Sequence, residues 1–152
     1  TFFFVADALM PPVKSAAFDA VTCYGALHHL PDPERAFVNA ADTLKSGGHL
    51  LAAEPNLSFF RPIFDLLMRL FPIWYEEAND DPLISQKMIY DWEKSASVTT
   101  SISTSIFAPP HIFSFLGDNR GAWLFDFSEW VGSNLPFVKN NGGIILIHAQ
   151  RK

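Results

Sequence analysis

Charged residues and cysteine are both scarce in this chain. Only 18% of its 152 residues are Asp, Glu, Lys or Arg, below the usual level of about a quarter for a soluble domain. The formal net charge is −5, and no basic block is longer than Arg151–Lys152, whereas binding to a nucleic-acid backbone requires clustered lysine and arginine. The single cysteine, Cys23, cannot form a disulfide within the chain. We therefore expect no nucleic-acid partner and a cytoplasmic location.

Long uninterrupted hydrophobic segments are missing as well. The segment 57–75 approaches the length of a membrane-spanning helix, but Arg61, Asp65 and Arg69 interrupt it. These charges recur every four residues and would form one polar stripe on an otherwise apolar helix. The first residues, TFFFV, have no basic region and do not resemble a signal peptide. The sequence predicts no transmembrane segment, and 57–75 is expected to cap its own domain or to make peripheral contact with an apolar surface such as a membrane.

The region 18–54 has the pattern of a strand–helix–strand unit. The apolar run 18–24 is typical of a strand buried on both faces, as in a parallel sheet. Asp32–Pro33 predicts a helix start, with Asp32 as the N-cap and proline in the first turn. Gly47–Gly48 predicts the end of that helix, and the next strand follows at 49–53. Such a connection between parallel strands is right-handed.

Further elements are predicted on both sides of this unit. The apolar residues 2–6 predict a short strand, and Asp81–Pro82 predicts a helix that runs to about Lys94. Alternation over 98–107 indicates a strand with one solvated face, near a sheet edge. The spacing of apolar residues predicts a helix over 123–135, and 144–149 predicts a final strand. The fold class is α/β.

Polar and small residues follow three of the predicted strands. They are Asp7 and Ala8 after the first, Gly25 to His29 after the second, and Glu54 to Asn56 after the third. Ligands of open α/β sheets bind beyond the carboxyl ends of the strands. Gly25 and Ala26 leave room for a flat ring, Asp7 can accept a hydrogen bond from an exocyclic amine, and His28 and His29 can exchange protons near neutral pH. No histidine, cysteine or carboxylate spacing is typical of a metal site, and none is predicted.

Short motifs occur in a fixed order along the chain: VADA at 5–8, FDAV at 18–21, LHHL at 27–30, PDPE at 31–34, LKSGG at 44–48, EPN at 54–56 and GGIILI at 142–147. The ordered set resembles the C-terminal part of class I S-adenosylmethionine-dependent methyltransferases of type 11, which include small-molecule enzymes of quinone biosynthesis. The family's glycine-rich G-x-G-x-G turn and the acidic residue that grips the ribose have no counterpart here.

The resemblance implies a partial Rossmann-like methyltransferase fold that lacks the N-terminal glycine-rich β-α units. Its sheet is mostly parallel and built from 18–24, 48–54, 97–107 and 143–150, with the last strand antiparallel between its neighbours. Residues 1–6 either pair with the open edge of 18–24 or stay loosely attached. The whole chain, 1–152, is expected to be the C-terminal portion of one domain, with 57–95 as a helical cap-like insertion. The open sheet edge offers a route to self-association.

The resemblance also implies roles for the residues at the strand ends. S-adenosylmethionine is the expected cofactor, and a small, apolar molecule is the expected methyl acceptor. The cofactor-binding residues would be Asp7, Ala8, Gly25, Ala26 and Leu27, the catalytic residues His29 and His28 with His29 preferred as base, and the substrate contacts Glu54 and Asn56.

Alternatives remain open at this point. The chain by itself is expected to bind S-adenosylmethionine weakly or not at all, and a non-catalytic methyltransferase-like domain that binds a protein partner is the second hypothesis. A nucleotide-binding oxidoreductase half is a weaker third. His28 could bond a loop carbonyl, and Glu54 could be a solvated strand end. The aromatic residues of 113–130 are predicted to lie in the core, with a substrate wall as the alternative.

Overall fold

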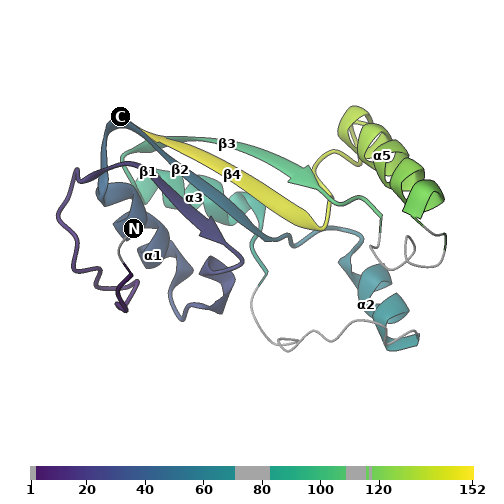
Figure 1. The fold of residues 1–152 in the computed structure, drawn as a ribbon, viewed down its shortest axis with the longest axis horizontal. Coiled ribbons are helices and arrows are strands. Elements are labelled where there is room, and N and C mark those ends of the chain that lie inside the picture. The colour runs from purple at the N-terminus through teal and green to yellow at the C-terminus, as the bar shows by residue number, and fades with distance from the viewer. Residues whose placement is uncertain (1–2, 71–82, 109–115, 117) are drawn as a thin grey trace. The chain divides into compact units, whose positions relative to one another are not determined.

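The computed structural model describes residues 3–70, 83–108, 116 and 118–152, and has a four-stranded sheet in the order β1-β2-β4-β3 (Figure 1). The elements are β1 (Phe18–Tyr24), η1 (Leu27–His29), α1 (Pro33–Asp42), β2 (Leu44–Pro55), α2 (Arg61–Leu70), α3 (Gln86–Ser95), β3 (Val98–Ser105), α5 (Asp118–Asn134) and β4 (Ile144–Arg151). Strands β1 and β2 are parallel, whereas the end of β4 pairs with the start of β3 through Lys152 N and Ser97 O at 3.0 Å. The α/β class and an antiparallel last strand between its neighbours are confirmed.

Helix α1 begins where the sequence predicted and ends earlier. The Asp32 carboxylate accepts a hydrogen bond from Arg35 N at 3.0 Å, and Pro33 occupies the first turn. The helix stops at Asp42 because Thr43 caps it, with Thr43 Oγ1 donating to Ala40 O at 2.7 Å. The prediction that the helix extends to Gly47–Gly48 is therefore wrong.

The two glycines instead form a bulge at the start of β2. The register between β1 and β2 shifts from Phe18 opposite Leu44 to Ala20 opposite His49, so residues 45–48 form extra chain on one strand. Gly47 has φ of 78°, a conformation that favours glycine. A Cβ on Gly48 would lie 2.9 Å from Lys45 O, so the backbone approaches too closely for any side chain there.

The described residues group into two compact units, and unit 1 consists of 1–54, 86–102 and 147–152. Helices α1 and α3 cover one face of its strands (Figure 1). The rings of Phe37 on α1 and Trp92 on α3 are 5.5 Å apart, and both side chains are buried. They form the core of this unit together with the buried strand residues Leu50, Ala52, Val98, Ile147 and Ala149.

Strand β1 is exposed, contrary to the prediction that both of its faces are buried. Tyr24 is 87% and Phe18 41% exposed. The strand lies at the edge of the sheet, and no described helix of unit 1 covers the face that carries Tyr24 and Leu51. Residues 3–6 form no strand and project into solvent, so the predicted strand at 2–6 is not formed over its described residues. Without a hydrogen-bonding neighbour, an extended apolar segment gains nothing from strand geometry.

Unit 2 consists of 55–85 and 103–146, as far as these residues are described. Ile84 forms an isolated parallel bridge with Asn56 and is fully buried. This extended pairing explains why α3 begins at Gln86 rather than at the predicted Asp81–Pro82, which lies outside the described residues. In α2 the predicted polar stripe includes an ion pair, with Arg61 Nε donating to Asp65 Oδ1 at 2.7 Å.

Helix α5 presents an aromatic stripe to solvent. Trp123 is 66%, Phe127 48% and Trp130 65% exposed. Their rings stack on one another, with centroid distances of 5.5 and 6.4 Å. The prediction that these aromatic residues lie in the core is wrong for all three, since about half or more of each side chain is exposed. Among the described helices, none is long and apolar enough to cross a membrane.

Candidate active site

The carboxyl ends of β1 and β2 lie side by side, as the sequence predicted for parallel neighbours. Tyr24 is opposite Ala53, and Gly25 N donates to Ala53 O at 2.8 Å. Gly25 then turns the chain with φ of 56°, which is strained for any residue with a side chain. The turn leads directly into η1, so Gly25 to His29 form a compact loop at the end of the sheet.

The Glu54 carboxylate holds this loop in place. Glu54 is completely buried. Its Oε1 accepts hydrogen bonds from Ala26 N and Leu27 N, both at 3.0 Å. Its Oε2 accepts from His28 N at 3.4 Å and lies 2.6 Å from His28 Nδ1. One side chain at the end of β2 therefore binds three consecutive backbone amides and one imidazole after β1.

Such a partner set offsets the cost of burying a charge. An unpaired carboxylate in the interior is strongly unfavourable, whereas one that receives several charge-assisted hydrogen bonds is tolerated. Both oxygens of Glu54 are satisfied in this way, so the alternative that Glu54 is a solvated strand end is wrong. The predicted structural alternative for His28 holds only in part, because its ring bonds a carboxylate rather than a loop carbonyl.

The two adjacent histidines have different surroundings. His28 is buried, with 8% of its surface exposed, whereas His29 is exposed. Their ring centroids lie 3.9 Å apart at an interplanar angle of 38°. The loop therefore carries two different imidazoles. That of His28 is held by the Glu54 carboxylate, and that of His29 packs against His28 and is exposed to solvent.

The segment of Asp7 and Ala8 is exposed and attached to α1. Asp7 Oδ1 accepts from Leu9 N at 2.8 Å, which makes a tight turn, and Asn39 Nδ2 donates to Ala8 O at 3.2 Å. This contact of Asn39 was not predicted from the sequence, because a polar residue on a predicted helix does not indicate a bond to a backbone 31 residues away. Glu54 and the 25–29 loop are brought together by hydrogen bonds, whereas Asp7 and Ala8 are joined to the unit through α1.

Asn56 belongs to unit 2, where its side chain hydrogen-bonds to the backbone of residues 140–142. It is buried, and its Nδ2 donates to Gly142 O at 2.8 Å and to Asn140 O at 3.2 Å. Thr104 supports the same turn, since its Oγ1 accepts from Gly142 N at 3.0 Å. Thr104 was not singled out in the sequence, where it is one of several alternating hydroxyl residues.

Cys23 on β1 responds electrostatically to Glu54. Burial raises the pKa of the Cys23 thiol, and the negative charge of Glu54 raises that pKa further. A raised pKa disfavours the thiolate, which is the reactive form. Cys23, which is half-buried, is therefore a weak nucleophile in this environment.

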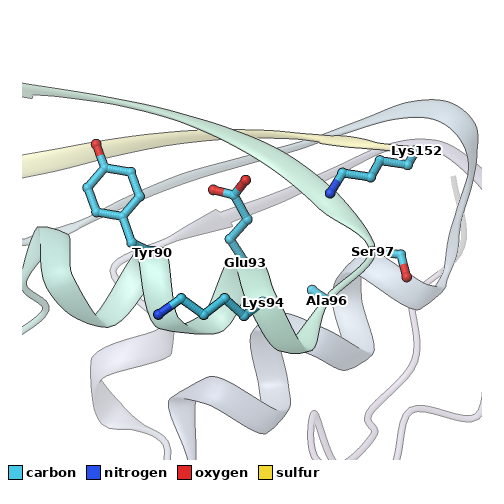
Figure 2. A pocket seen from close by; sticks show the side chains of 6 residues that line it. All are labelled: Tyr90, Glu93, Lys94, Ala96, Ser97 and Lys152. Atoms are coloured by element: carbon cyan, nitrogen blue, oxygen red, sulfur yellow. The ribbon is translucent and has the colours of Figure 1, made fainter.

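A cavity of about 480 Å³ lies elsewhere in unit 1. Figure 2 shows its lining residues, which are Tyr90, Glu93, Lys94, Ala96, Ser97 and Lys152. It is next to the start of β3, whereas the predicted site residues follow the ends of β1 and β2. None of the predicted site residues lines it. Within the described ranges, no three histidine, cysteine or carboxylate side chains come together as a metal site.

Comparison with known proteins relates this part of the chain to methyltransferases. Residues 2–52, which contain β1, the 25–29 loop and most of β2, match the family model of a methyltransferase domain. Demethylmenaquinone methyltransferase of Renibacterium salmoninarum is 27% identical over 150 residues, which cover 96% of this chain and 54% of that protein. The part of the chain that carries the candidate site is therefore similar to a methyltransferase domain.

Solved methyltransferases have the same fold. An S-adenosylmethionine-dependent methyltransferase from Thermotoga maritima superposes with a TM-score of 0.64 at 18% identity, over 99% of this chain and 64% of that one. Geranyl diphosphate C-methyltransferase from Streptomyces coelicolor, crystallised with S-adenosyl-L-homocysteine, gives a TM-score of 0.58 at 12% identity, over 98% of this chain and 52% of that one. The chain spans about half the length of the curated relative that it matches.

Proposed function

We propose that the chain is the C-terminal part of an enzyme that transfers a methyl group from S-adenosylmethionine to a small, apolar acceptor. The observation that carries the proposal is the buried Glu54 carboxylate, which organises the 25–29 loop at the carboxyl ends of two parallel strands. Ligands of open α/β sheets bind at this edge. Its hydrogen bonds fix the backbone of a glycine-containing loop at the edge where a ligand would bind.

The residues present fit part of the cofactor. Asp7 is exposed, and its second carboxylate oxygen could accept a hydrogen bond from the adenine amine. Gly25 and Ala26 present backbone with little side chain, so Gly25, Ala26 and Leu27 could run along the cofactor, with Ala8 beside Asp7. The methionine end and the ribose have no matching motif in this sequence. We therefore expect this chain by itself to have only one wall of the cofactor cleft.

Methyl transfer requires that the acceptor atom be aligned with the methyl group, and for some acceptors it also requires a base that removes a proton. When bound, the cofactor supplies a methyl group on a positively charged sulfur, which is ready for in-line displacement. Holding the acceptor in line can supply much of the rate. A base is needed where the acceptor must lose a proton, and His29 and His28 are the candidates at the loop. Glu54 and Asn56, proposed as substrate contacts, are both buried against protein partners.

An apolar acceptor is supported by the surface of unit 2. Its exposed large hydrophobic residues include Leu57, Phe59, Ile63, Leu66, Trp123, Phe127, Trp130 and Phe137. Exposed apolar surface of this extent is typical of ligand or protein contact sites. The curated relative acts, by its name, on demethylmenaquinone, and we extend to this chain only the class of a small apolar acceptor. In this proposal α2 is part of a lid over that acceptor.

A non-catalytic role remains the competing proposal. The exposed edge of β1 and the uncovered face that carries Tyr24 and Leu51 could receive a protein partner or a second copy of the chain. The upstream gene sequence separates the two proposals. A glycine-rich loop within about half a domain length, roughly 80 residues upstream, supports the enzyme, and a start codon near Thr1 supports the binding module.

Calorimetric titration with S-adenosyl-L-homocysteine tests the enzyme proposal. We expect weak or undetectable binding to this chain and micromolar binding to the complete gene product. Asp7→Asn in the complete gene product should weaken that binding, and Asp126→Asn on α5 is the matched control. Micromolar affinity for this chain alone would contradict the expectation that half the cleft is outside it. Deletion of 57–70 without any change in acceptor preference would refute the lid.

A further inference from the structure

We infer that His28, through its Nε2 atom, is the proton acceptor of the reaction, and that Glu54 is the residue that positions it. The inference deepens the proposed methyl transfer and rests on it. It differs from the sequence expectation, which preferred His29 as base and gave Glu54 a place at the substrate mouth. The geometry of the two rings and of one carboxylate carries the distinction.

The first step concerns the tautomer of His28. A neutral imidazole has one nitrogen that donates and one that accepts, and the partner of one nitrogen decides the state of the other. Nδ1 lies 2.6 Å from Glu54 Oε2, and a carboxylate can only accept. The proton must therefore be on Nδ1, which leaves the lone pair of the ring on Nε2.

The second step concerns what surrounds that lone pair. His28 is 92% buried, as its exposed fraction of 8% implies, and none of the described residues hydrogen-bonds to Nε2. A buried acceptor without a partner is unfavourable unless a ligand supplies the donor. A Cβ built on Gly25 would lie 4.0 Å from His28 Cε1, so the ring is next to the backbone proposed to line the cofactor.

The third step concerns the role of the hydrogen bonds that the Glu54 carboxylate accepts. Its Oε1 takes both backbone amides of Ala26 and Leu27, which fixes the loop independently of the imidazole. Its Oε2 is then left for His28. When Nε2 gains a proton, the ring becomes a cation beside a buried anion, so Glu54 stabilises the product of proton transfer. His29, by contrast, is exposed to solvent.

The proton and electron pairs balance without a further reactant. An O–H or activated C–H bond of the acceptor breaks, and its proton moves to the lone pair of His28 Nε2. The electron pair left on the acceptor forms the bond to the methyl carbon, and the pair of the carbon–sulfur bond returns to sulfur. The inference thus names an acceptor that must lose a proton, either a hydroxyl compound or one with an activated carbon.

Nitrogen NMR of the chain tests the tautomer without any activity measurement. In the ¹⁵N-labelled chain, long-range proton–nitrogen correlations should show that the neutral form of His28 carries its proton on Nδ1 and none on Nε2. In Glu54→Gln this single tautomer should give way to a mixture, while His49 and His148 keep their signals. A neutral His28 ring with its proton on Nε2 in the unaltered chain would overturn the inference.

Kinetics of the complete gene product tests the role, with a short-chain demethylmenaquinone reduced beforehand to its hydroquinone as the acceptor probe. His28→Gln should lower kcat by about 10²-fold or more and leave the KM for S-adenosylmethionine unchanged. His29→Gln should cost less than His28→Gln, and His148→Gln should have no effect. Glu54→Asp, which keeps the charge, should retain more kcat than Glu54→Gln. An active His28→Gln with an inactive His29→Gln would overturn the inference, whereas an unaltered gene product that transfers no methyl group to any acceptor would refute the proposed function instead.

Discussion

Asp19 on β1 and Lys45 on β2 form an ion pair, with Lys45 Nζ 2.8 Å from Asp19 Oδ1, although 26 residues separate them. The bulge formed by residues 45–48 places Lys45 beside the start of β1. This contact replaces the expected position of Lys45 in the last turn of a helix. The hydrogen bond and the charge of Lys45 lower the pKa of the Asp19 carboxyl.

Replacement of Lys45 should therefore raise the pKa of Asp19. In Lys45→Gln, NMR titration of the carboxyl should move toward the ordinary aspartate value. A lowered pKa contributes stability above the ordinary value, and that contribution is lost as the pH falls through the folded-state value. Because both groups are exposed, we expect little change in the free energy of unfolding at neutral pH. Lys94→Gln is the control, since Lys94 lowers the pKa of Asp91 and should leave Asp19 unchanged.

The charge of Glu54 should have a measurable effect on the pKa of the Cys23 thiol. Glu54→Gln removes the electrostatic part of the rise in the Cys23 pKa. The thiolate fraction at a fixed, mildly alkaline pH should then increase, and alkylation by iodoacetamide should accelerate. The midpoint of the rate against pH should shift downward, whereas mere loosening of the structure would raise the plateau instead. His28→Gln keeps the Glu54 charge and should leave the midpoint in place, and an unshifted midpoint in Glu54→Gln would show that Glu54 is neutral.

Phe37 should contribute strongly to stability. It is completely buried and packs on Trp92 with ring centroids 5.5 Å apart. Phe37→Ala removes this packing and leaves a cavity, so the free energy of unfolding should fall by about 3–5 kcal/mol. Urea denaturation followed by far-UV circular dichroism measures the loss. Tyr90→Ala, on α3 but 51% exposed, should change stability by no more than about 0.5 kcal/mol, and an equal loss in both variants would contradict the assigned core.

Asn56 should matter for folding through its amide group. Asn56→Ala removes the donor to Gly142 O in a buried site and the donor to Asn140 O in a part-buried one. The expected cost is about 1–3 kcal/mol in the free energy of unfolding, measured by chemical denaturation. Asn134→Ala removes a similar bond to Trp130 O at an exposed position and should cost about 0.5 kcal/mol or less. If the two variants lose the same stability, the buried turn around Gly142 is not what Asn56 supports.

The α/β class and the N-terminus of α1 could be predicted because local chemistry decides them. Asp32 and Pro33 determine a helix start wherever they occur in this order, and the alternation of Val98 to Ser105 requires a strand with one covered face. The end of α1 could not be predicted in this way. Gly47–Gly48 is compatible with a helix end and with a bulge, and only the pairing of Leu44 with Phe18 selects the bulge.

Burial was the least predictable property. The apolar composition of β1 and of α5 predicted core positions, yet Tyr24 and Trp123 are exposed. Whether an apolar residue is buried depends on which element covers it, and that information is not local. The reverse holds for Glu54, whose charge suggested a solvated or substrate-facing position although it is fully buried.

The sequence by itself determined the resemblance to methyltransferases, the order of most strands and helices, and the set of residues that follow the strand ends. These features depend on short motifs and on the periodicity of apolar residues, which are local properties of the sequence. The tertiary structure decided what those residues do to one another. It joined Glu54 to Ala26, Leu27 and His28, and thereby distinguished two adjacent histidines that the sequence could not tell apart. The physical reason is that a buried carboxylate must find its donors in space, and those donors come from another strand.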